Sequence, residues 1–161
     1  MKNLFLSLIL SHIVVLSAVA EQKSLPTVAG QLTYLLNETT SQCEVRLNQK
    51  IILKLDCEGA YLPAVLGNFR GNFGGVDQLV VFQELPMGNA CNGGPLHLIG
   101  LRKNQSYLIK PIDFCGGEDP VVKASDSSVT ITFPSGPPNR GKGRIPTEKW
   151  EFKNAKLIRI R

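Results

Sequence analysis

Histidine is nearly absent from this chain, whose 161 residues include only two, His12 and His97. His12 lies in the apolar run at the N-terminus, so His97 is the one imidazole left for the schemes that activate a serine or cysteine nucleophile. The GxSxG motif that presents a catalytic serine is also absent. These absences weigh against hydrolytic catalysis and favour a non-enzymatic protein.

Paired metal ligands and an intact phosphate loop are missing as well. Zinc sites place Cys or His residues in pairs at short spacing, and no such pair occurs here. Residues 136–143, GPPNRGKG, follow the phosphate-loop pattern up to Lys142, but Gly143 stands where a Ser or Thr holds magnesium. We therefore expect no cofactor and no metal, and we expect no nucleic-acid partner.

Long hydrophobic runs are absent beyond residue 20. The single run, from Leu4 to Val19, follows Lys2 and ends in Ala18-Val19-Ala20, which has small residues where signal peptidase requires them. It is shorter than the roughly 20 apolar residues of a membrane-spanning helix. The sequence therefore predicts a bacterial signal peptide at 1–20, no transmembrane segment after cleavage, and one periplasmic or secreted domain at 21–161.

Four cysteines are present, and an even number in an oxidising compartment indicates disulfides. Three pairings are possible from the number alone. Cys43 and Cys57 close a predicted hairpin, while Cys91 and Cys115 flank the open end of a second one at 96–112. We therefore expect the bonds Cys43–Cys57 and Cys91–Cys115, each stabilising the fold by about 3 kcal/mol.

Short alternating segments separated by polar turns dominate the remaining sequence, which has fifteen Gly, ten Pro and no long amphipathic helix. The segment 31–36 fits either a strand or a short helix. This pattern predicts an all-β, mainly antiparallel fold, either a small sandwich or a barrel with two disulfides. Strands are expected near 43–47, 51–57, 61–66, 78–85, 96–101, 107–112, 129–133, 149–152 and 156–160.

The register of the first hairpin follows from its cysteines. If Cys43 faces Cys57 across a turn at 48–50, every inward residue of the pair is apolar. The same register puts Glu44 opposite Asp56 and Arg46 opposite Lys54, and like charges directly across a strand pair are unfavourable.

Positive charge is concentrated at the C-terminal end. Residues 139–161 contain eight basic and two acidic residues, whereas 21–138 contain nine basic and eleven acidic ones. Arg140, Lys142 and Arg144 are the candidate contacts for an anionic envelope polymer or lipid headgroups. A solvated face of edge strands, in which lysines prevent aggregation, explains the same charges equally well.

Two glycine-rich turns, GNACNGGP at 88–95 and FCGG at 114–117, would be joined by the second disulfide. Over residues 77–134 this pattern resembles a group of small exported bacterial β proteins whose function is not known. The resemblance implies export and β structure and transfers no activity. A rigid loop of this kind is suited to recognition, so Asn89 and Asn92 are further candidate binding residues.

The sequence thus favours an exported non-enzymatic binding module, of the inhibitor or immunity-protein type, with a protein of the cell envelope or an anionic polymer as its partner. The first alternative is a hydrolase of envelope polymers that uses His97 with a carboxylate. The candidate carboxylates are Asp113, Glu118 and Asp119. The second alternative is a structural envelope component that binds anionic surfaces.

Overall fold

The computed structural model describes residues 22–37, 39–87 and 94–160, and in these ranges the chain forms twelve β-strands and no helix. Every strand pair is antiparallel. The predicted all-β, antiparallel fold is thus confirmed. The predicted signal peptide lies outside the described residues, and within them no helix is long and apolar enough to cross a membrane.

The strands form three sheets of four, and none of the sheets closes on itself. Each sheet is one uninterrupted stretch of the chain. The first sheet contains β1 (Gln22–Thr27), β2 (Gly30–Asn37), β3 (Gln42–Leu47) and β4 (Lys50–Asp56). The middle sheet contains β5 (Ala60–Arg70), β6 (Gln78–Pro86), β7 (Leu96–Arg102) and β8 (Gln105–Ile112). The last sheet contains β9 (Val121–Ala124), β10 (Ser128–Phe133), β11 (Glu148–Lys153) and β12 (Lys156–Ile160).

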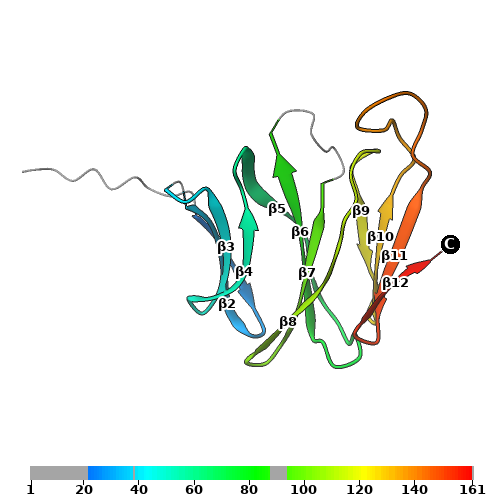
Figure 1. Ribbon diagram of the computed structural model, residues 1–161. Coiled ribbons are helices and arrows are strands. Elements are labelled where there is room, and N and C mark those ends of the chain that lie inside the picture. The colour runs from blue at the N-terminus through cyan, green and yellow to red at the C-terminus, as the bar shows by residue number, and fades with distance from the viewer. Residues whose placement is uncertain (1–21, 38, 88–93, 161) are drawn as a thin grey trace, which may run out of the picture.

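The three sheets stack face to face in chain order (Figure 1). In each sheet the strands follow one another in sequence order, so the first and last strands are the two edges. β4 contacts β8, and β5 contacts both β2 and β9, so the sheets stack in the same sense. One side of the stack, the last-strand flank, therefore carries the edges β4, β8 and β12, and the first-strand flank carries β1, β5 and β9.

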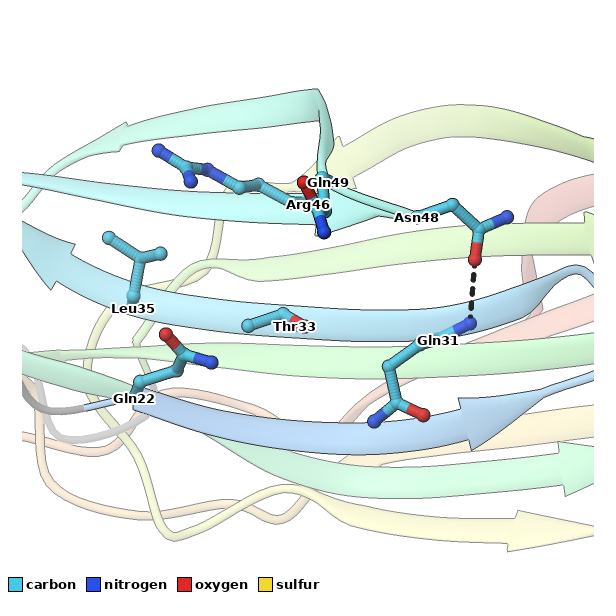
Figure 2. A pocket seen from close by; sticks show the side chains of 7 residues that line it. All are labelled: Gln22, Gln31, Thr33, Leu35, Arg46, Asn48 and Gln49. Carbon is cyan, nitrogen blue, oxygen red and sulfur yellow. Dashed lines mark hydrogen bonds between the residues drawn. The ribbon is translucent and has the colours of Figure 1, made fainter.

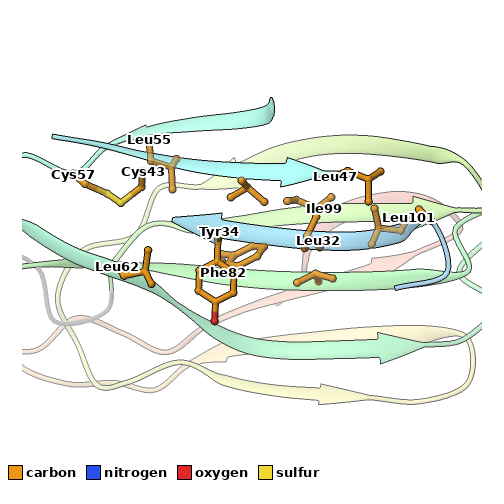
Figure 3. Close-up of a cluster of buried hydrophobic side chains, with 13 residues drawn as sticks. Leu32, Tyr34, Cys43, Leu47, Leu55, Cys57, Leu62, Phe82, Ile99 and Leu101 are labelled. Carbon is orange, nitrogen blue, oxygen red and sulfur yellow. A yellow bond between two sulfur atoms is a disulfide. The ribbon is translucent and has the colours of Figure 1, made fainter. Parts of the chain in front are cut away.

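The first core fills the space between the first and middle sheets (Figure 3). Leu32 and Tyr34 of β2 face Phe82 of β6 and Ile99 of β7 across this space. The Tyr34 and Phe82 rings meet edge to face, with centroids 5.3 Å apart. A polar contact also joins the two sheets, because the buried Gln78 Oε1 of β6 accepts a 2.7 Å hydrogen bond from the Val28 backbone N–H between β1 and β2. Because side chains alternate between the two faces of a strand, every second residue of β2, β6 and β7 points into this core.

The second core lies between the middle and last sheets and is richer in phenylalanine. Phe114 and Phe133 stack with ring centroids 4.0 Å apart, and Phe73 lies 6.1 Å from Phe152. The middle sheet is therefore covered on both faces, which explains why the Leu79-Val80-Val81-Phe82 run of β6 is completely buried.

The β3–β4 hairpin contains the predicted disulfide Cys43–Cys57, with Cα atoms 5.6 Å apart. The predicted register is wrong, because Cys43 pairs with Leu55 instead of Cys57. Asn48 and Gln49 alone form the turn, both at positive φ, and a register shift follows after Val45. The like-charge pairs are thereby avoided, and Glu44 faces Lys54.

The other predicted strands are present, and β5 is longer than expected. The ambiguous segment 31–36 is strand β2, because its Leu32 and Tyr34 reach the core by alternation. The strands β1 and β9 were not predicted. Cys91 lies outside the described residues, so the bond Cys91–Cys115 stays a prediction, and no cysteine of the described part is free.

Candidate functional site

The predicted basic contacts lie in the long connection between β10 and β11. The Arg144 guanidinium is hydrogen-bonded within this connection, since Nη2 donates a 2.9 Å hydrogen bond to the Ser135 carbonyl oxygen and Nε donates to Ser135 Oγ. A bridge between Gly136 and Ile145 closes the loop. Arg140 and Lys142 are exposed at its far end. The structure thus assigns Arg144 a role in holding the loop and leaves two cations at the surface.

The other predicted binding residues, Asn89 and Asn92, lie outside the described residues. The neighbouring Gly94 is described, at a positive φ of 48°. A Cβ atom there would lie 2.3 Å from the Glu84 carbonyl oxygen, so the chain passes against β6 where only glycine fits.

His97 does not meet any of the carboxylates expected for a hydrolase. It lies on β7, and its Nε2 forms a hydrogen bond with Glu84 Oε1 on the neighbouring strand β6. Both side chains are mostly covered at the rim of the first core. Asp113, Glu118 and Asp119 are exposed in the connection from β8 to β9. In the described part, no cluster of three or more His, Cys, Asp or Glu could hold a metal ion.

A shallow polar hollow of about 530 Å³ lies on the outer face of the first sheet, and Figure 2 shows its side chains. Amide side chains dominate it, among them Gln22, Gln31 and Gln49. Asn48 has a structural role there, because its Oδ1 accepts a 2.9 Å hydrogen bond from the Gln31 N–H and its Nδ2 donates to the Ala29 carbonyl. Arg46 is paired with Glu44 at 2.6 Å. The hollow therefore offers polar groups without an unpaired charge.

A second hollow, of about 660 Å³, lies on the last-strand flank between the edge strands β8 and β12. We call it the β8–β12 hollow. Tyr107 and Leu108 line it from β8, and Ile158 lines it from β12. These three are 42%, 56% and 49% exposed, although large apolar side chains are usually covered. Exposed apolar residues that gather around one hollow are typical of a contact surface.

The two walls of the β8–β12 hollow are held in place by the turn between β11 and β12. Ala155 N–H donates a 2.6 Å hydrogen bond to the Phe73 carbonyl oxygen of the β5–β6 loop. Gly74 lies against the same turn, where a Cβ atom would come within 2.4 Å of Asn154 Cα. This close approach requires glycine and fixes the last sheet against the middle one. The hollow is therefore preformed.

The charges that line the β8–β12 hollow are all positive. They belong to Arg102 at the end of β7, Lys110 of β8 and Lys156 of β12. None of the three forms an ion pair within the described residues, whereas Arg46 and Arg159 each have an acidic partner there. Lys156 also pairs directly with Lys153 across the β11–β12 hairpin, an unfavourable juxtaposition that a bound anion would relieve.

Sequence reasoning missed this site because its parts are far apart in the chain. Arg102 and Lys110 lie in the region that carries no net positive charge, and only Lys156 belongs to the basic C-terminal end. The available clue was the alternation of β8, in which Tyr107, Leu108 and Ile109 are consecutive apolar residues. Consecutive residues of a strand point to opposite faces, so at the edge strand of a sheet such a run leaves apolar side chains partly exposed.

Comparison with known proteins gives no relative: no family model, no curated protein and no solved structure matches this chain.

Proposed function

We propose that this chain is an exported, non-enzymatic binding module of the bacterial cell envelope, built as a sandwich-type stack of sheets. The observation that carries the proposal is the β8–β12 hollow, which combines exposed apolar side chains with unpaired cations on two edge strands. The disulfide Cys43–Cys57 supports a location outside the reducing cytosol. An inhibitor or immunity-type protein needs a rigid contact surface of this kind.

The hydrolase alternative has less support. His97 is engaged with Glu84, and neither residue lines the hollow of the first sheet or the β8–β12 hollow. A general base must reach its substrate within hydrogen-bond distance. The binding module is therefore the better account of the same residues.

Site-specific photo-crosslinking in the intact envelope tests the proposal. A photoreactive amino acid replaces Tyr107 in one variant and Tyr61 in its control, because Tyr61 is equally an exposed tyrosine on a strand but lies on the first-strand flank. We expect adducts of defined mass from position 107 and none from position 61. No adduct at 107, or the same adducts from both positions, would contradict the proposal.

A further inference from the structure

The outer edge of β8 offers backbone groups to a further strand. β8 pairs with β7 only, so its other edge is free in the described part of the chain. Arg102 pairs with Gln105 across a two-residue loop, which makes these two a hydrogen-bonded pair. Hydrogen-bonded and non-hydrogen-bonded pairs alternate along an antiparallel ladder. The N–H and C=O groups of Ser106 and Leu108 therefore point away from β7.

This free edge has a definite length. The register between β7 and β8 is regular from Arg102 to Leu98 and shifts beyond it. Pro111 follows Lys110 and has no N–H to offer. The usable edge is therefore Gln105–Lys110, which is long enough for a strand of ordinary length.

We propose that an extended acidic segment of a partner protein adds as a strand to β8 along Gln105–Lys110. This inference rests on the proposed function and names the partner's chemistry. Backbone hydrogen bonds to Ser106 and Leu108 supply the attachment, as in other cases of strand addition. Alternate side chains of the segment then meet Tyr107 and Ile158 in the β8–β12 hollow.

The charge of the hollow selects an acidic segment. Arg102, Lys110 and Lys156 line it, and no acidic residue does. Carboxylates of the segment gain three cations that have no other ionic partner in the described part. A basic segment would place like charges together, which disfavours the wrong partner.

Two other occupants fit the hollow less well. A second copy of this chain would bring its own β8 and the same three cations against these ones, so like charges would oppose pairing. A lipid surface would satisfy the cations but gives no backbone partner to the outward N–H groups of Ser106 and Leu108, and burial of unpaired N–H groups is costly. Charge and backbone together therefore favour an acidic peptide segment.

Binding of two synthetic octapeptides tests the proposal, one with alternating Val and Glu and one with alternating Val and Lys. Fluorescence anisotropy measures their affinity for the full mature protein, for Lys110→Glu/Lys156→Glu, and for Lys123→Glu/Lys149→Glu. The last variant is the matched control, because it makes the same change of charge at two lysines of the last sheet, Lys123 and Lys149, that do not line the β8–β12 hollow.

We expect the Glu peptide to bind the wild-type protein and the control, and to lose about tenfold or more in affinity for the Lys110→Glu/Lys156→Glu variant. That variant should in turn prefer the Lys peptide. Equal affinity for both peptides, or equal losses in the two variants, would overturn the proposal. Two other results would also overturn it. One is a wild-type protein that sediments as a dimer paired through β8, and the other is a protein that binds anionic vesicles but neither peptide.

The two experiments can reject strand addition and the binding module separately. Crosslinks from position 107 to an envelope protein, together with no discrimination between the two peptides, would reject strand addition and leave the binding module standing. Absence of both crosslinks and peptide binding would reject the two together.

Discussion

The two flanks of the stack carry the same number of edge strands but protect them differently. On the first-strand flank β1 contains Pro26, β5 contains Pro63 and two register shifts, and β9 spans only four residues. Prolines, irregular registers and short strands are the usual means of preventing an edge from pairing with another chain. On the last-strand flank β12 has no proline and no register shift, and the proline and the register shift of β8 both lie at its C-terminal end, beyond Ile109.

β8 thus keeps a regular register without proline over its first five residues, Gln105–Ile109. β4 belongs to the same flank, but its register shift falls inside the strand, between Ile51 and Leu53. Open backbone, exposed apolar side chains and three unpaired cations thus come together around the β8–β12 hollow. An edge without protection is a hazard unless a partner covers it.

The largest expected effect is a loss of stability that leaves the binding site unchanged, and it tests whether β4 belongs to the site. Replacing both Cys43 and Cys57 by Ser removes a cross-link that encloses about 15 residues, so the free energy of unfolding should fall by about 3 kcal/mol. Affinity for the Glu octapeptide should stay unchanged, because β8 and β12 belong to the other two sheets. Urea unfolding followed by circular dichroism measures the first quantity. A parallel loss of affinity in the folded variant would show that β4 belongs to the site.

The second prediction concerns two double variants, each of which removes exposed apolar side chains from one flank. Tyr107→Lys/Ile158→Lys should weaken binding of the Glu octapeptide by about a hundredfold, since added positive charge does not compensate for the lost apolar contact. Tyr61→Lys/Val121→Lys changes equally exposed residues on the first-strand flank and should have no effect. Isothermal calorimetry measures both. Equal losses would mean that the flanks do not differ in function.

The third prediction concerns a residue that belongs to neither hollow. His97→Ala should cost about 1 kcal/mol of stability, because the partly covered Glu84 loses its hydrogen bond and regains water only in part. Peptide affinity should be unaffected. Thermal unfolding and anisotropy measure the two quantities, and incubation with envelope material checks for turnover. Turnover by the wild-type protein that His97→Ala abolishes would favour the hydrolase instead.

The smallest expected effect comes from salt. Raising ionic strength from about 0.05 M to about 0.5 M shortens the range of electrostatic attraction several-fold. Affinity for the Glu octapeptide should therefore fall by about fivefold, since backbone and apolar contacts persist. The Tyr107→Lys/Ile158→Lys variant should show a steeper dependence on salt. An affinity that does not change with salt would show that the cations do not contribute to binding.

Much of the fold was accessible from the sequence because local rules determine it. Alternation in 129–133 and 149–152 placed β10 and β11, and the polar turns at Asn48 and Asn154 closed two hairpins. The disulfide Cys43–Cys57 followed from the first of these hairpins. The register did not, because a two-residue turn with a later shift brings the sulfur atoms together as well as a direct pair would.

The stacking of the sheets and the site were not accessible. Periodicity shows that the Leu79–Phe82 run is buried on both faces, but it does not show that a separate sheet covers each face. β1 and β9 were missed because Pro26 interrupts one and the other has only four residues. The β8–β12 hollow is lined by strands some fifty residues apart in the chain, which only the packed structure brings together.

Hydrogen exchange at two backbone amides tests strand addition to β8 most directly. The N–H groups of Ser106 and Leu108 point away from β7 in the isolated protein, so they should exchange rapidly. Saturation with the Glu octapeptide should slow both amides by about tenfold or more while that of Lys123 on β9 stays unchanged. Unaltered exchange at Ser106 and Leu108 in the saturated complex would contradict the account.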